Sequence, residues 1–310
     1  MSSQLHITNG DILTNKLNTL KLEGDIITWR EMLCEGKTET NVGSESFWKT
    51  RFEFLNKNYK ISKTWFIDKT LKEYRTLCNH KQEDRIVLWF DFDLFDQINM
   101  LAVISWLKTH RPYAEISLVS SEGEEDSLDI LGLGELTDEQ LRKLYTNRTL
   151  LTQDDIEYAD YVWQLYCSDN PIRLENLKDF DSFQFSHLSG AIEAHLMRFP
   201  TIRNGLNEVE NNILRLARSA KPKTKLELLN TVLRNQGRYG FGDTQYERVI
   251  TKLKPLFTNL SPVKLSKKGM EILEEKTSYY SCIQENDAYL GGALKYNFLY
   301  NSETNRILKL

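Results

Sequence analysis

The chain has 310 residues, 40% of them hydrophobic and 27% charged, which is enough material for roughly two globular domains and excludes wholesale disorder. Its net charge of −4 is unevenly divided, because residues 206–310 carry 17 basic and 11 acidic side chains while the rest of the chain is acidic. It shows neither a secretory leader pattern nor an apolar run of about eighteen residues. Its cysteines and histidines are scattered without zinc-ligand spacing, so we expect a soluble, cytoplasmic protein with reduced thiols.

Short apolar runs alternate with helical patterns in the front part of the chain. Strands are expected at 4–8, 25–29, 85–90 and 115–120. Helices are expected at 11–20, 46–59, 64–77 and 93–110. The run RIVLWF at 85–90 is almost wholly apolar, which is typical of a strand covered on both faces. The alternation predicts an α/β domain over residues 1–134 with an open, mainly parallel sheet.

An acidic, glycine-containing segment, Ser121–Gly134, marks the expected end of that domain. The residues beyond it have helical patterns at 137–145, 154–167 and 185–198, and prolines separate them. We interpret residues 135–205 as a helical linker region.

Residues 206–310 have the element order of a winged helix. Helices are expected at 207–219, 224–235 and 243–254, followed by a short strand within 255–268 and a hairpin within 289–310. The pattern predicts a winged-helix-like C-terminal module, although three helices and a hairpin also occur as plain packing modules.

The same module is the basic part of the chain, and the stretch 215–268 holds 13 basic and 3 acidic residues. This asymmetry predicts an anionic partner, either a nucleic acid or a protein. The alternative is that the tail docks on the acidic front domain of its own chain. The nucleic-acid contacts that we expect are Arg248, Lys252, Lys254, Lys267 and Lys268.

Polar residues follow each predicted strand, at the edge where ligands bind in open α/β sheets. If the strands are parallel, their ends meet, and we expect the carboxylates of Asp11 and Asp91 to lie within about 8 Å of each other. The expected catalytic residues are Asp91, Asp93, Arg30 and Glu31. The expected ligand-binding residues are His6, Asn9, Gly10, Asp11, Gln97 and Ser120.

Each of these residues also has a structural interpretation. Asp11 and Asp93 can be helix N-caps, Arg30 and Glu31 a surface pair, and His6 a core histidine. The chain contains no P-loop, no dinucleotide fingerprint in its proper context and no GxSxG motif.

Several short blocks spread over nearly the whole chain are similar to a known family. They are HITNGD (6–11), WREMLCEG (29–36) followed by Arg51, LWFDFDLFDQ (88–97), GELTDEQL (134–141), FPTIRNGLNEVENNIL (199–214), GFGDTQ (240–245) and LSKKG (265–269). Together they resemble the bacterial family named domain of unknown function 1835. Members of that family often carry Glu-His where this chain has Asp91 and Phe92, which argues against a histidine acid–base at position 92 and leaves Asp91, Asp93 and Gln97 as candidates. The family has no assigned activity, so the resemblance implies a layout and a cytoplasmic context but no reaction.

The sequence therefore favours a two-part binding protein: a small polar or anionic ligand in the α/β domain, and a nucleic acid or protein partner on the tail. The alternative is a divalent-metal-dependent hydrolase or transferase for a phosphorylated or nucleotide-like substrate, with Asp11, Asp91 and Asp93 holding magnesium or manganese. In a third interpretation the tail is only an internal docking module.

Overall fold

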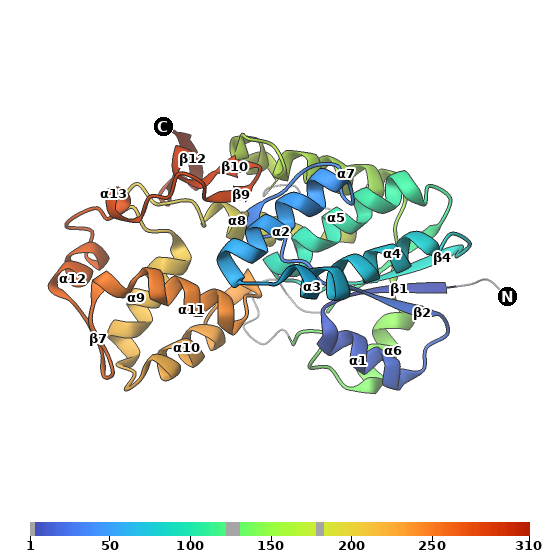
Figure 1. Cartoon of the computed structure of the whole chain (residues 1–310), viewed down its shortest axis with the longest axis horizontal. Coiled ribbons are helices and arrows are strands. Elements are labelled where there is room, and N and C mark those ends of the chain that lie inside the picture. Colours follow the sequence, from blue (N-terminus) through green and yellow to red (C-terminus); the bar gives the residue numbers. More distant parts are fainter. Residues whose placement is uncertain (1–3, 122–130, 178–182) are drawn as a thin grey trace.

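The computed structural model describes residues 4–121, 131–177 and 183–310, and a five-stranded sheet forms the centre of the front half (Figure 1). In order across the sheet, the strands are β2 (Asp25–Trp29), β1 (Gln4–Asn9), β4 (Arg85–Trp89), β5 (Glu115–Val119) and β6 (Thr149–Leu150). The first four are mutually parallel, and β6 pairs with β5 antiparallel. The predicted open, mainly parallel α/β sheet is confirmed.

The connections that follow β1 and β4 lead to opposite sides of the sheet. It leaves β1 towards β2 on one side, returns to β4 on the other side of β1, and then continues to β5. Neighbouring strands that lead away in opposite directions leave a crevice at their carboxyl ends, which is where open α/β sheets bind ligands. The β1–β4 pair is therefore the point in this fold where a site is most expected.

Helices cover both faces of the sheet (Figure 1). They are α1 (Asp11–Leu20), α2 (Glu45–Tyr59), α3 (Lys63–Phe66), the π-helical turn η1 (Ile67–Leu71), α4 (Lys72–Asn79), α5 (Leu94–His110), α6 (Asp138–Thr146) and α7 (Gln153–Tyr166). The predicted helix at 64–77 is present as the three segments α3, η1 and α4.

Strand β4 shows how the alternation of side chains builds two cores. Ile86 and Leu88 belong to the large core under α5 and α7, whereas Val87 and Trp89 belong to a smaller core. That smaller core also contains Leu17 of α1 and residues of α6. Because successive strand residues point to opposite faces, an apolar run such as RIVLW is buried on both sides.

The back half is mainly helical. Its helices are α8 (Leu188–Leu196), α9 (Glu208–Ala220), α10 (Lys225–Arg234), α11 (Asp243–Lys252), α12 (Lys267–Leu273) and α13 (Tyr280–Ile283), with short 3₁₀ turns at Pro171–Leu177, Phe183–Phe185, Gly237–Tyr239 (η4), Lys254–Leu256 and Lys295–Asn297. Two antiparallel hairpins follow α11, namely β7 (Phe257–Leu260) with β8 (Val263–Leu265), and β11 (Phe298–Asn301) with β12 (Arg306–Lys309). Three helices and the β7–β8 hairpin keep the expected order of a winged helix, but the assignment itself stays a prediction.

The two halves are joined by strand pairing as well as by side chains. Strand β3 (Gly36–Lys37) of the front half pairs parallel with β9 (Tyr289–Gly291), which in turn pairs with β10 (Ala293–Leu294). Most of the predicted boundary at 121–134 lies outside the described residues.

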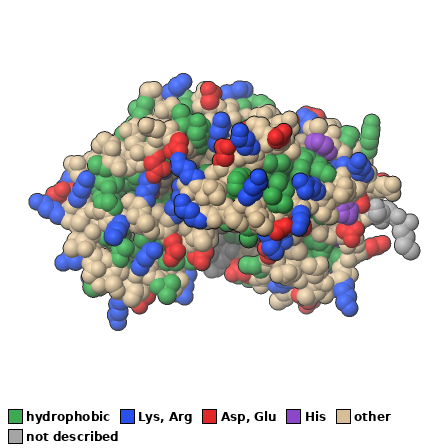
Figure 2. All heavy atoms as spheres, in the orientation of Figure 1, with side chains coloured by type: hydrophobic (Ala, Val, Ile, Leu, Met, Phe, Trp, Pro, Cys, Tyr) green, Lys and Arg blue, Asp and Glu red, His purple; other side chains and the backbone are tan. Residues whose placement is uncertain are grey.

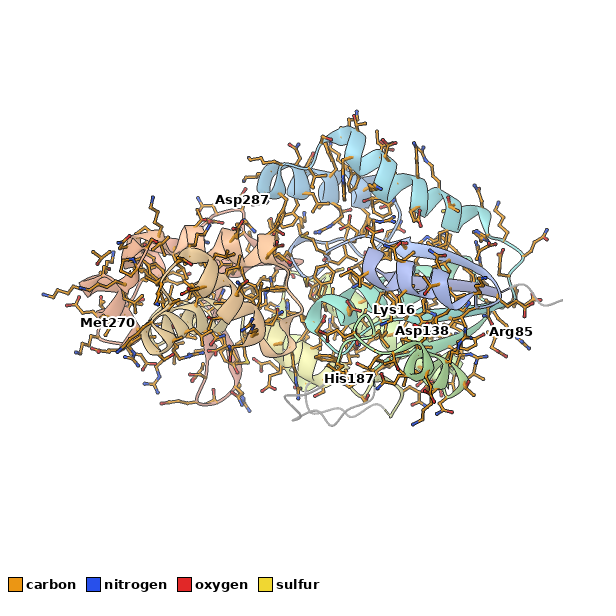
Figure 3. All side chains as sticks on the ribbon, turned by 90° about the horizontal axis from the view of Figure 1, so that it is seen from below. Lys16, Arg85, Asp138, His187, Met270 and Asp287 are labelled. Carbon is orange, nitrogen blue, oxygen red and sulfur yellow. The ribbon has the colours of Figure 1, made fainter. Side chains whose placement is uncertain are left out.

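The carboxyl ends of the parallel strands point towards the back half. In Figure 3, Arg85 at the start of β4 lies near one end of the molecule and Met270 of α12 near the other. Lys16 of α1 and Asp138 of α6 lie next to each other in the same view, as expected from the bonds that Lys16 donates to the carbonyls of Gly134 and Leu136. No helix among the described residues is long and apolar enough to cross a membrane.

Candidate functional site

A network of polar side chains joins the ends of β1 and β4, where the topology leads us to expect a crevice. The Asn9 amide donates to Oδ1 of Asp96, and Asn99 Nδ2 donates to Oδ1 of Asn9 at 2.9 Å. Gln97 Nε2 donates to the carbonyl of Asp91 at 2.6 Å. The structure thus brings together Asn9, Asp91 and Gln97 as predicted, and it adds Asp96 and Asn99, which the sequence had placed in a helix without a role.

Asp91 is held directly after β4 by donors from two later segments. Its Oδ1 accepts a bond from Ser121 Oγ and its Oδ2 one from the backbone N–H of Leu133, both at 2.7 Å. Burial raises the pKa of Asp91 to about 6, although these bonds favour the ionised form. The carboxyl group is therefore fixed in position and titrates much closer to neutrality than a free aspartate.

Asp93 and Asp96 complete a group of three carboxyls that we call the strand-end carboxylates, together with Asp91. Asp93 is the N-cap of α5, and its Oδ1 accepts from the N–H of Asp96 at 2.9 Å. Oδ2 of Asp96 accepts from the N–H of Asp91 at 2.6 Å. Burial and the neighbouring carboxylates raise the pKa of Asp93 to about 7 and that of Asp96 well above its usual value.

None of the strand-end carboxylates forms an ion pair with a basic residue in the part of the chain that the structure describes. Three such groups cannot all be ionised at low energetic cost, because they repel one another and are shielded from water. The site therefore holds protons near neutral pH, or it needs a cation from outside the protein.

Two further oxygens at this edge have no hydrogen-bond partner among the residues that the structure describes. They are Oε1 of Gln97, whose side chain is buried, and Oγ of Ser120. Gly10, directly after Asn9, has no described atom within 4 Å of the position that a Cβ would occupy there. This edge thus combines unpartnered acceptors with room beside Gly10.

The back half reaches this site through its glycine-rich turn. A Cβ on Gly240 would overlap the carboxyl group of Asp93, so the turn after η4 packs directly on the strand-end carboxylates. Gly240 also has φ +66, a conformation that side chains with a Cβ disfavour.

We expect Gly240→Ala to lower the free energy of unfolding by about 2 kcal/mol, because it adds both backbone strain and overlap with Asp93. Gly237→Ala is the matched control: it has φ +62 but nothing within 4 Å of its Cβ position, so it should lose only about 1 kcal/mol. Urea unfolding of the two variants measures the difference. Equal losses would contradict a tight contact between the turn and Asp93.

Arg30 and Asp11 lie at the same sheet edge but outside the network. Arg30 Nε donates to Oδ1 of Asp11 at 3.0 Å, and the Asp11 side chain is 62% exposed. The guanidinium of Arg30 holds the pKa of Asp11 below its ordinary value. Gly10, not Asp11, is the N-cap of α1. No interaction of the described residues joins Asp11 to Asp91.

The predicted metal ligands do not come together. Among the described residues, no three histidine, cysteine, aspartate or glutamate side chains are arranged to hold a metal ion. Asp11, Asp91 and Asp93 therefore do not form the expected magnesium or manganese set. The physical reason is that the oxygens of each carboxyl accept bonds from different protein donors, Arg30 for the first and backbone N–H groups for the other two.

The expected catalytic role of Glu31 is not supported by its surroundings, which make it a structural residue. Its Oε2 accepts from Arg51 Nε at 2.9 Å, and both side chains are buried. Arg30 and Glu31 are thus not a surface pair. Arg51 also donates to the carbonyls of Met32, Glu35 and Lys37, so it ties the loop after β2 to α2.

His6 is a core histidine rather than a ligand of the site. Its Nδ1 accepts from Trp89 Nε1 at 3.0 Å, which leaves Nε2–H to donate to the carbonyl of Glu23 at 3.0 Å. Burial lowers the pKa of His6, so the ring is neutral. A different histidine lies at the strand-end edge: the His187 ring contacts Phe92 edge-on at 6.1 Å, and its Nε2 lies 3.2 Å from the carbonyl of Ser121.

The third helix of the tail, α11, has one exposed face, but its two candidate contact residues are paired within the chain. Arg248 donates to Asn58 Oδ1 at 2.8 Å and lies 3.7 Å from Glu35 Oε2. Lys252 donates to Tyr296 OH at 3.0 Å and pairs with Glu285 at 2.9 Å. Both residues were expected to contact nucleic acid; the structure pairs them within the chain, and the expected contact stays a prediction.

The other three basic residues of that prediction differ in their surroundings. Lys254 is exposed and has no partner among the described residues. Lys267 is 91% exposed beside Glu271, and the ammonium of Lys268 lies 4.7 Å from the centre of the Tyr279 ring.

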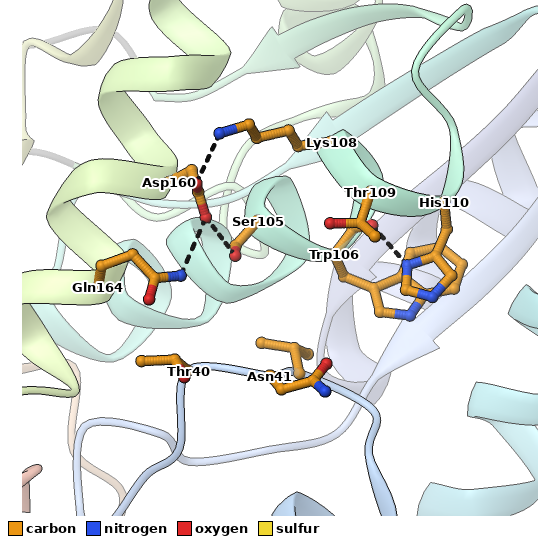
Figure 4. Close-up of a pocket in the computed structure, with 10 residues that line it drawn as sticks. Thr40, Asn41, Ser105, Trp106, Lys108, Thr109, His110, Asp160 and Gln164 are labelled. Carbon is orange, nitrogen blue, oxygen red and sulfur yellow. Dashed lines mark hydrogen bonds and ion pairs between the residues drawn. The ribbon is translucent and has the colours of Figure 1, made fainter.

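A separate cavity of about 250 Å³ lies at the far end of α5, between α5, α7 and the 40–42 loop (Figure 4). Asp160 at its base already accepts from Ser105, Lys108 and Gln164. His110 stacks on Trp106 with ring centres 4.5 Å apart. A helix of 17 residues, roughly 25 Å long, separates this cavity from the strand-end carboxylates, so the two are not one site.

No family model matches the chain, and no curated protein is similar to it. One similar solved structure is the DNA-binding, cleavage and re-ligation domain of Plasmodium falciparum topoisomerase II, with a TM-score of 0.47 and 11% sequence identity. The likeness covers 81% of this chain and 42% of that chain, so this chain spans less than half of that structure. A likeness of this degree carries no argument about function, and the resemblance to domain of unknown function 1835 stays a prediction.

Proposed function

We propose that the chain is a binding protein whose strand-end crevice takes a small polar ligand that carries an amine or guanidinium group. The observation that carries the proposal is the presence of three clustered carboxyls, Asp91, Asp93 and Asp96, without a basic partner at the topological switch point of the sheet. A cationic ligand supplies the missing positive charge. An anionic ligand, the other class expected from the sequence, is repelled by these carboxyls.

The surroundings of the carboxyls support the same ligand class. The unpartnered Oε1 of Gln97 and Oγ of Ser120 can accept hydrogen bonds, and an ammonium or guanidinium group has only donors to offer. Gly10, next to Asn9, has no described atom within 4 Å of a Cβ position, so the end of β1 has room beside it. Because the carboxyls hold protons near neutrality, binding of a cation there releases protons, and affinity rises with pH.

Calorimetric titration with agmatine and spermidine tests the proposal. We expect one-to-one binding to the wild-type chain, a Kd at least tenfold weaker for Asp91→Asn, and proton release measurable as a heat that depends on the buffer. Glu139→Gln, which removes an exposed carboxylate on α6, is the matched control and should leave the affinity within about twofold. Equal binding to wild type and Asp91→Asn, or binding to neither, contradicts the proposal.

A second candidate function is acid–base catalysis, because a carboxyl with a pKa near 6 or 7 is suited to donate or accept a proton at neutral pH. This alternative makes a distinct prediction. Failure of the wild-type chain to bind either amine in the same titration would favour the enzyme over the binding protein.

A further inference from the structure

Outside α11, several basic side chains of the tail have no partner among the residues that the structure describes. Within residues 215–268, five basic side chains form no hydrogen bond or ion pair with any residue that the structure describes. They are Lys221, Lys223, Arg234, Lys254 and Lys264, and all are exposed. Figure 2 shows Lys and Arg side chains spread over the tail, at the left of that view.

Three of these lysines lie together. Lys221 and Lys223 are in the turn between α9 and α10, and Lys264 is in β8. The turn is bonded to the hairpin, because the N–H of Val263 donates to the carbonyl of Pro222 at 3.0 Å and Ser261 Oγ to that of Lys223 at 3.5 Å. We call Lys221, Lys223 and Lys264 the hairpin–turn lysines.

Side chains alternate between the two faces of β8, and this alternation places Lys264 on the solvent side. Val263 and Leu265 on either side of it are buried, so the Lys264 side chain points to solvent from the same edge that holds the turn. Of the nearby acidic residues, Glu227 lies at the turn itself, where its Oε2 accepts from the backbone N–H of Lys223 at 2.5 Å, and Glu247 pairs with Lys225 at 3.7 Å. Neither carboxylate forms an ion pair with a hairpin–turn lysine among the described residues, so three lysines beside one carboxylate leave this surface with a net positive charge.

We propose that the hairpin–turn lysines bind the phosphate backbone of a double-stranded nucleic acid. The hairpin exposes Thr258, Asn259 and Ser261 beside the lysines, and hydroxyl and amide groups of this kind also bond to phosphate oxygens. A membrane surface would need an apolar face to insert, and the hairpin does not expose a large apolar side chain. The net charge of −4 gives the whole chain no general attraction for polyanions, so binding depends on this surface.

The test compares two triple variants of the full-length chain that change the net charge equally. One is Lys221→Gln/Lys223→Gln/Lys264→Gln, and the control is Lys49→Gln/Lys81→Gln/Lys143→Gln, which removes three exposed lysines of the front part. Binding of a fluorescent DNA duplex is measured by anisotropy over a range of salt concentrations. Three phosphate contacts predict a log–log salt slope of about −3 for the wild type. We expect at least tenfold weaker binding for the first variant at low salt and a change within about twofold for the control.

Three outcomes would overturn the proposal. The wild type could fail to bind duplex at low salt, both variants could bind as the wild type does, or both could lose binding equally. Binding of the lysine surface to phosphatidylserine vesicles but not to duplex would make the partner a membrane. Because the lysines are exposed, we expect both variants to unfold at the same temperature as the wild type. Unchanged thermal unfolding then confirms that a change in anisotropy reflects lost binding and not a lost fold. This test does not involve the strand-end carboxylates, so its result is independent of the amine titration.

Discussion

Replacing Arg51 by Met should lower the free energy of unfolding by about 3–5 kcal/mol. The substitution leaves the carboxylate of Glu31 buried without its partner, and it leaves the carbonyls of Met32, Glu35 and Lys37 without the donors that Arg51 supplies. A loss of this size is a large share of the stability of a typical domain. Urea unfolding followed by circular dichroism measures it.

The matched control for Arg51→Met is Arg85→Met. Arg85 is paired with Glu115 at 3.7 Å, but both side chains are about half exposed, so the loss should stay within about 0.5 kcal/mol. If Arg51→Met is also tolerated within about 1 kcal/mol, the buried pair does not hold the loop after β2 in place, and Glu31 returns as a candidate for the functional site.

Replacing Asp93 by Asn should stabilise the protein at neutral and alkaline pH, by on the order of 3 kcal/mol at pH about 8. The pKa of Asp93 is raised to about 7 in the folded state, so the folded state holds a proton that the unfolded state releases. A raised carboxyl pKa contributes stability that is present at low pH and is lost as the pH rises through the folded value. Asparagine is also a good N-cap and can still accept from the N–H of Asp96.

The advantage of Asp93→Asn should therefore grow between pH about 4 and 7 and level off above that range. Thermal unfolding of both proteins across this range measures it, with Asp169→Asn, at an exposed position, as the control that should change little at any pH. Destabilisation by Asp93→Asn at pH about 8 would instead mean that Asp93 is ionised and favourably solvated in the folded protein.

Local patterns were sufficient to predict the front half of the fold. The largely apolar run at 85–90 and the helical pattern from 93 to 110 correspond to β4 and α5, because a buried strand and a capped, largely buried helix are set by neighbouring residues. The parallel sheet then places the ends of β1 and β4 side by side, which is why Asn9, Asp91 and Gln97 could be expected to meet.

Partners that are distant in the sequence could not be predicted in the same way. Glu31 follows Arg30 but pairs with Arg51, and Arg248 contacts Asn58 of the front half. Asp96 has the pattern of a solvated first-turn residue of α5, and the bonds that it accepts from Asn9 and from the N–H of Asp91 place it in the strand-end network. One available signal was the spacing of three aspartates over six residues directly after a buried strand, which is an unusual density of charge for such a position.

We infer that the strand-end carboxylates beside the β1–β4 pair share protons near neutral pH and thereby form a site for a cationic ligand. A carbon-13 NMR titration of the side-chain carboxyls, assigned with Asp91→Asn, Asp93→Asn and Asp96→Asn, tests it directly. We predict that at least two of the three titrate with apparent pKa values above about 5.5 and that a bound amine lowers these values. Titration of all three below about 4.5, in the ordinary range of aspartate, would contradict the claim.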